Sequence, residues 1–91
     1  MPSDPNGPPL SPYSVLDLTR VRSGPTCVRQ LADWGADVIK IEEPRNGDPI
    51  RTWGNQRDGV GLMWKSVSRN KRSITLNLRV PAGQDIVRRL V

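Results

Sequence analysis

Apolar residues occur along the chain in short blocks that predict alternating strands and helices. Residues 14–18 and 37–42 are rich in β-branched residues and leucine, which is typical of buried strands. Between them we expect a helix over about 25–34, because its apolar positions share one helical face: Cys27, Val28, Leu31 and Ala32. A strand, a helix and a second strand within about 30 residues form a βαβ unit, with parallel pairing and a right-handed crossover.

The second half of the chain begins with a segment that has little apolar periodicity. Residues 43–72 are rich in turn-forming residues and predict a long loop, in which 62–67 is typical of a short helix. The alternating pattern of residues 73–78 predicts a third strand. Pro81 then opens a helix whose apolar positions share a face: Ile86, Val87 and Leu90. This order of elements predicts an α/β fold with a parallel sheet. Because the last helix reaches Val91 without a stop signal, we expect the polypeptide to be a piece of a longer one.

The composition limits the class of protein. Five of the nine prolines lie in residues 1–12, so we expect a disordered tail over residues 1–13 and a structured part over residues 14–91. The N-terminus lacks the features of a signal peptide, and no apolar run approaches the ~20 residues of a membrane span, which predicts a cytoplasmic protein. A single cysteine, Cys27, excludes an intrachain disulfide. The lack of histidine excludes any Ser-His, Cys-His or His-metal site made by this chain alone.

Charge is unevenly distributed between the two halves of the chain. Residues 1–50 hold seven acidic and five basic residues, whereas residues 51–91 hold two acidic and nine basic residues. A basic half is typical of proteins that bind an anionic partner, such as a nucleotide, a phosphorylated cofactor or nucleic acid. A solvated basic face without a partner would give the same composition.

The segment between the first strand and the first helix is one candidate for an anion site. Gly24 allows a tight turn there, Pro25 suits the first helical position, and the helix N-terminus offers free amides to a phosphate. Ligands of open parallel sheets bind beyond the carboxyl ends of the strands, where this turn lies. The dinucleotide fingerprint of three glycines is missing, so a standard NAD site is not expected, and a plain strand–helix turn is the alternative.

Three further features admit both a binding and a structural interpretation. The segment 69–73 holds three basic residues and leads into a strand, so it either binds a phosphate or forms a charged loop. Glu42, at the end of the second strand, either contacts ribose hydroxyls or lies in solvent or beside a base. Trp53 and Trp64 in the long loop either stack on a nucleobase or pack against the fold.

Several of these segments, taken in order, carry a resemblance to a known family. They are LDLTR at 16–20, GP at 24–25, LADWGADVIKIE at 31–42, GDP at 47–49 and RNKRSITLNL at 69–78. Over residues 15–91 the chain resembles the N-terminus of the class III CoA-transferase family, which also contains α-methylacyl-CoA racemases and carnitine-type CoA transferases. The resemblance implies a Rossmann-like large domain, of which residues 14–91 form the N-terminal portion. It also implies a smaller domain and two chains interlocked in a homodimer.

The same resemblance implies a coenzyme A site at the carboxyl edge of the sheet. The positions that match this site are Arg22, Ser23, Glu43, Leu76, Asn77, Leu78 and Arg79. The family's nucleophile is an aspartate well beyond residue 91, so no residue here is assigned a catalytic role, and no metal is implied. Three positions depart from the family pattern: Arg22 adds a charge, Glu43 stands where the family often has proline or a base, and Asn77 replaces a usual aspartate.

The sequence therefore predicts part of a CoA transferase that moves CoA between an acyl-CoA and a carboxylic acid. This segment would supply part of the CoA site, and the 91-residue chain alone would be inactive. An acyl-CoA racemase of the same family is one alternative. A small basic nucleic-acid-binding module is another, favoured by the basic half and the tryptophans but opposed by the parallel βαβ pattern and the lack of a known reader motif. A truncated product without function is the third.

Overall fold

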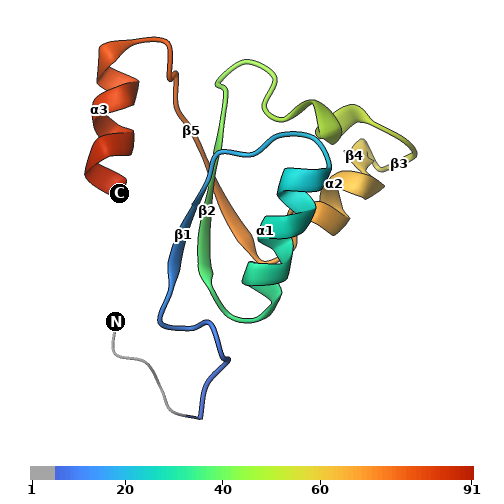
Figure 1. Cartoon of the computed structure of the whole chain (residues 1–91). Coiled ribbons are helices and arrows are strands. Elements are labelled where there is room, and N and C mark those ends of the chain that lie inside the picture. Colours follow the sequence, from blue (N-terminus) through green and yellow to red (C-terminus); the bar gives the residue numbers. More distant parts are fainter. Residues whose placement is uncertain (1–5) are drawn as a thin grey trace.

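The computed structural model describes residues 6–91, which form a three-stranded parallel sheet flanked by helices (Figure 1). The strands of this sheet are β1 (Ser14–Asp17), β2 (Asp37–Glu42) and β5 (Lys71–Thr75). The α-helices are α1 (Ser23–Asp33), α2 (Leu62–Val67) and α3 (Pro81–Leu90). The connection from β2 to β5 also contains a 3-10 helix, η1 (Pro49–Thr52), and a hairpin of β3 (Gln56–Arg57) and β4 (Val60–Gly61).

Strand β2 occupies the centre of the sheet, and both neighbouring strands pair with it in parallel. The register sets Lys40 of β2 opposite Asp17 of β1 on one side and Ser73 of β5 on the other. Because the three strands run in the same direction, their carboxyl ends meet at one edge, which lies at the top of Figure 1. The predicted α/β fold with a parallel β-α-β unit is confirmed.

The apolar core lies between α1 and one face of the sheet. It consists of four buried residues: Val28, Ala32, Ala36 and Val38. Val28 and Ala32 are one helical turn apart, so both lie on the side of α1 that faces β2. This cluster is small. Ile50 of η1 and Val67 of α2 are buried outside it, and ion pairs supply further contacts across the sheet.

Residues 6–13 of the proline-rich segment form turns near the amino ends of the strands. The Leu10 amide donates a hydrogen bond to the Trp34 carbonyl (2.9 Å), and the Asp37 amide donates one to the Tyr13 carbonyl (3.0 Å). The Leu10 side chain packs against the apolar core. Of the tail expected to be disordered, residues 1–5 lie outside the described residues, and residues 6–13 are held by these contacts.

Two element boundaries differ from those expected. Helix α1 begins two residues early, at Ser23. Strand β5 is displaced toward the N-terminus from the expected range 73–78, because Lys71 and Arg72 at its start have acidic partners across the sheet. The strand gives way to a turn in which the Asn77 side chain accepts a backbone amide hydrogen bond.

The long connection between β2 and β5 is more structured than a loop. The expected helix over 62–67 is present as α2, and the hairpin that precedes it packs on η1. A Cβ atom placed on Gly61 would lie 2.4 Å from the Arg51 carbonyl oxygen, so only glycine permits this approach of the two backbones.

Helix α3 is joined less firmly to the sheet than the other helices. Figure 1 shows α1, α2 and the hairpin on one side of the sheet and α3 on the other. The buried residue of α3 is Gly83, which contacts the turn after β5. Several large apolar side chains of β5, this turn and α3 remain exposed: Ile74, Leu78, Val80, Ile86 and Leu90. Exposed apolar surface of this kind favours association.

We therefore expect the isolated 91-residue chain to associate in solution and to unfold at modest temperature. Ile86→Lys should shift it toward the monomer, because the charge is placed on an exposed apolar side chain and removes no buried contact. Arg88→Lys, on the same helix, controls for the substitution itself. Analytical ultracentrifugation and thermal unfolding measure the two properties. A monomeric wild-type chain with a sharp transition well above room temperature would contradict the expectation.

Candidate ligand-binding site

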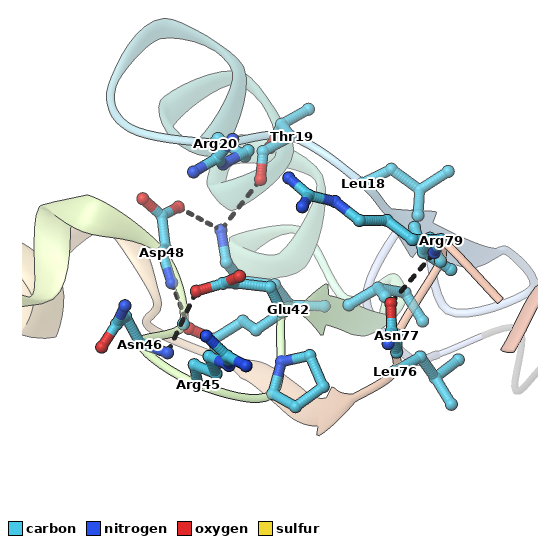
Figure 2. Close-up of a pocket in the computed structure, with 16 residues that line it drawn as sticks. Leu18, Thr19, Arg20, Glu42, Arg45, Asn46, Asp48, Leu76, Asn77 and Arg79 are labelled. Carbon is cyan, nitrogen blue, oxygen red and sulfur yellow. Dashed lines mark hydrogen bonds and ion pairs between the residues drawn. The ribbon is translucent and has the colours of Figure 1, made fainter.

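A pocket of about 630 Å³ lies at the carboxyl edge of the sheet (Figure 2). Its walls come from the three segments that follow the three strands, and its floor is the end of β2. The lining residues are Leu18, Thr19, Arg20, Lys40, Ile41, Glu42, Glu43, Pro44, Arg45, Asn46, Gly47, Asp48, Leu76, Asn77, Leu78 and Arg79. This is the place where open parallel sheets receive their ligands.

Five of the seven residues predicted for the CoA site line this pocket: Glu43, Leu76, Asn77, Leu78 and Arg79. The exposed Glu43 carboxylate accepts the Asn46 amide hydrogen bond (3.0 Å). Arg22 and Ser23 do not line the pocket. They are exposed at the start of α1, where Arg22 is the N-cap residue and Ser23 the first helical residue.

Three arginines border the pocket, one on each of its three walls. They are Arg20, Arg45 and Arg79. Among residues 6–91, none of their guanidinium groups has a hydrogen-bond or ion-pair partner, and Figure 2 shows Arg79 extending across the pocket toward Thr19. Arg20 and Arg45 are not among the site residues predicted from the sequence. Both follow predicted strands closely, and that position is the signal that could have identified them.

The floor of the pocket is held by a buried ion pair. Lys40 Nζ lies 2.7 Å from Asp48 Oδ2, and each side chain is 1% exposed. Burial by itself raises the pKa of Asp48, but hydrogen bonds from Lys40 and from the Ile50 and Val21 amides outweigh it, so the net pKa lies below the ordinary value. The carboxylate is therefore charged and fully hydrogen-bonded inside the fold.

A second buried carboxylate, Glu42, lies beside the first. It accepts two hydrogen bonds from Arg51 (2.7 and 2.8 Å), and others from the Ser73 hydroxyl and the Asp48 amide. These contacts lower the pKa of Glu42 to about 2. The hydrogen bonds from the Arg51 guanidinium lower it most, and those from the Ser73 hydroxyl and the Asp48 amide add to the effect, against burial, which raises it. The Trp64 ring stacks on this guanidinium at 3.8 Å. Glu42 thus has a structural partner, and Trp64 packs against the fold.

A further buried ion pair, between Asp17 and Lys71, joins the two outer strands. Asp17 Oδ2 on β1 lies 2.9 Å from Lys71 Nζ on β5, and both side chains are almost fully buried. Burial by itself raises the pKa of Asp17, but the hydrogen bonds from Thr19 and Lys71 bring it below the ordinary value. The pair links residues that are 54 positions apart in the sequence.

The basic cluster over 69–73 forms further ion pairs. Besides Lys71, Arg69 pairs with Asp33 (2.6 Å) and Arg72 pairs with Asp37 (2.7 Å). Because each of its three bases already has an acidic partner, these contacts favour the structural interpretation of the cluster over the phosphate-binding one. The cluster also lies at the start of β5, away from the carboxyl edge.

Ion pairing accounts for much of the uneven charge along the chain. Of the nine basic residues in 51–91, five form ion pairs: Arg51, Arg69, Lys71, Arg72 and Arg88. Four of their partners lie in the acidic first half of the chain: Asp17, Asp33, Asp37 and Glu42. The basic second half is therefore neutralised largely by the fold itself.

Two structural absences hold for residues 6–91. No group of three or more Cys, Asp or Glu side chains there is arranged to hold a metal ion. No helix in that part of the chain is long and apolar enough to cross a membrane.

The arrangement defines a class of protein: an α/β protein with a parallel sheet and an arginine-bordered pocket at its carboxyl edge. The chain belongs to CoA-transferase family III, whose family model matches residues 10–91. This confirms the resemblance carried by the sequence motifs.

Curated relatives and a solved structure agree with this membership. The chain is 51% identical over 84 residues to succinyl-CoA–D-citramalate CoA-transferase of Chloroflexus aurantiacus, covering 91% of this chain and 21% of that protein. It is 46% identical over 83 residues to human succinyl-CoA:glutarate CoA-transferase, covering 90% of this chain and 19% of that protein. A CAIB/BAIF family protein from Brucella suis superposes with a TM-score of 0.82 at 40% identity, covering 93% and 24%. The chain thus spans about a fifth of the length of the curated relatives it matches.

The buried carboxylates predict how stability depends on pH. Because the folded-state pKa of Glu42, about 2, lies below its ordinary value of 4.5, the stabilisation is complete above pH 4.5 and is lost as pH falls toward 2. This pKa difference corresponds to a contribution on the order of 3 kcal/mol to the free energy of unfolding. Glu42→Gln should therefore be less stable at neutral pH and should lose less stability between pH 4.5 and 2. The pKa values of Asp17 and Asp48 are also lowered, so the Glu42→Gln variant should still lose some stability as pH falls.

Acid unfolding followed by tryptophan fluorescence measures this dependence. Glu43→Gln, which removes an exposed carboxylate from the next position in the chain, is the matched control. An acid transition in Glu42→Gln as steep and as deep as that of the wild type would show that Glu42 does not supply this stabilisation.

Proposed function

We propose that this chain supplies part of the CoA site of a class III CoA transferase, which moves CoA between an acyl-CoA and a carboxylic acid. In this proposal residues 14–91 are the N-terminal portion of the large domain, and the functional protein is an interlocked homodimer. Arg22, Ser23, Glu43, Leu76, Asn77, Leu78 and Arg79 are the proposed CoA contacts. Arg20 and Arg45 are added to them because they border the same pocket.

The observation that carries the proposal is the set of three arginines without partners among the described residues. Arg20, Arg45 and Arg79 come from three separate segments and border one pocket. Coenzyme A carries a diphosphate and a 3′-phosphate, and arginine binds phosphate through charge-assisted, often bidentate hydrogen bonds. The leucines at 18, 76 and 78 provide apolar surface beside these charges, as an adenine ring requires.

The names of the relatives favour a transferase over a racemase. Those named above, and formyl-CoA:oxalate CoA-transferase of Rhodopseudomonas palustris at 45% identity, are all named as transferases acting on a CoA thioester and a carboxylic acid. Nucleic acid is a weaker candidate ligand, because five of the nine bases in the basic half have acidic partners.

Removing the Arg79 guanidinium should weaken CoA binding to the 91-residue chain. We expect Arg79→Ala to cost about 1–2 kcal/mol of binding free energy, the size of one charge-assisted hydrogen bond. The loss should be smaller for dephospho-CoA if Arg79 meets the 3′-phosphate. Arg88→Ala, which removes a base of α3 that pairs with Asp85 outside the pocket, should leave both affinities unchanged.

Isothermal titration calorimetry with both ligands measures this difference. Equal losses for CoA and dephospho-CoA would remove the 3′-phosphate assignment. Tight, salt-sensitive binding of DNA together with no binding of CoA would overturn the proposed function.

The 91-residue chain on its own should not turn over acyl-CoA. Acyl transfer needs a carboxylate held against the thioester carbonyl, with donors placed for the developing oxyanion. Four aspartates of the described residues already have cationic partners: Asp17, Asp33, Asp37 and Asp48. Positioning alone can supply roughly 7–11 kcal/mol of barrier lowering, and none of these paired carboxylates is placed to supply it.

Mass spectrometry of CoA exchange between several acyl-CoA donors and carboxylate acceptors tests this expectation. Hydroxylamine cleavage and borohydride trapping detect a covalent acyl or CoA adduct. Turnover above a buffer control, or an adduct mapped to one of these four aspartates, would contradict it.

A further inference from the structure

The segment between β1 and α1 contains a backbone conformation that its sequence does not favour. Val21 has a φ of +72°, in the left-handed region that β-branched residues rarely adopt. Thr19 and Arg20, immediately before it, line the pocket. A conformation of this kind persists only where surrounding contacts impose it.

The contacts that impose it come from Asp48. Its two carboxylate oxygens accept the Val21 amide hydrogen bond at 2.9 and 3.0 Å. The same carboxylate accepts the Ile50 amide at 3.0 Å and Lys40 Nζ at 2.7 Å, and Lys40 Nζ also donates to the Thr19 carbonyl at 3.2 Å. The turn is thus held on both sides of Arg20, through the Thr19 carbonyl and the Val21 amide.

We propose that Asp48 is a positioning residue, whose carboxylate holds the turn 19–21 in the shape that directs Arg20 into the pocket. This inference rests on the proposed function, in which Arg20 contacts a phosphate of CoA. The Asp48 side chain is 1% exposed, so it acts through the Val21 amide and through Lys40. The turn is consequently formed before a ligand arrives, and no binding free energy is lost in ordering it.

A second role of Asp48, neutralising the buried Lys40, must be separated from this one. Glycine adopts a φ of +72° without steric cost, so Val21→Gly should lessen the need for the carboxylate that imposes this conformation. The Val21→Gly substitution does not restore a counter-ion to Lys40 when Asp48 is replaced. Rescue by glycine therefore reports the positioning role alone.

The experiment measures CoA affinity of the 91-residue chain by calorimetry in Asp48→Asn, Val21→Gly and the double variant. We expect Asp48→Asn to bind CoA about tenfold more weakly, the double variant to recover most of this loss, and Val21→Gly alone to bind within about threefold of the wild type. Val60→Gly in the Asp48→Asn background controls for an unrelated glycine. Asp58→Asn, in the exposed β3–β4 turn, controls for an unrelated carboxylate.

Wild-type affinity in Asp48→Asn, or no recovery in the double variant, would overturn the inference. If Asp48→Asn fails to fold, a pH titration of the ¹⁵N-labelled wild type decides, confined to pH values at which tryptophan fluorescence shows no unfolding. The Val21 and Ile50 amides should shift together, ahead of amides remote from Asp48, as Asp48 begins to be protonated. A Val21 amide that does not follow Ile50 would overturn the inference as well. If the wild-type chain binds no CoA, the proposed function fails, and the amide titration still judges the role of Asp48 in holding the turn.

Discussion

The fold is held first by three ion pairs on one face of the sheet. Two of them are buried, and the third joins the buried Glu42 carboxylate to a partly exposed Arg51. Asp17–Lys71 ties the outer strands together, while Lys40–Asp48 and Glu42–Arg51 tie the central strand to the segment that follows it. Removing one partner of a buried pair typically costs about 3–5 kcal/mol, because the other charge is left without compensation. Because the largest apolar cluster is small, we infer that these pairs select which segments meet at the carboxyl edge.

The pocket follows from this arrangement of charges. Two of the three acids that line the pocket, Glu42 and Asp48, are each paired with a base, whereas Glu43 accepts only the Asn46 amide. Arg20, Arg45 and Arg79 remain without partners among residues 6–91, and the proposed anion binding rests on them. Because these three arginines come from three separate segments and border one pocket, their charges add at one place, as the proposed phosphorylated ligand requires.

The sequence predicts the parts of this fold that depend on local pattern. The βαβ unit, the short helix over 62–67 and the helix from Pro81 follow from apolar periodicity and from proline placement, and the structure confirms them. The start of β5 and the use of cluster 69–73 could not be predicted this way, since Lys71 and Asp17 are 54 residues apart and no periodicity marks their pairing. Charged residues inside strands resemble loops until their partners are known. The positions of Arg20 and Arg45 just after predicted strands could have marked them, but that they meet Arg79 at one pocket depends on contacts between distant segments.

An NMR titration of the ¹⁵N-labelled 91-residue chain with CoA shows whether the pocket receives this ligand. We expect amide shift changes confined to the segments around the pocket, at residues 18–22, 43–48 and 76–79, with the ion-paired segment 69–72 unmoved. Shift changes centred on 69–72, or none anywhere at saturating CoA, would contradict it.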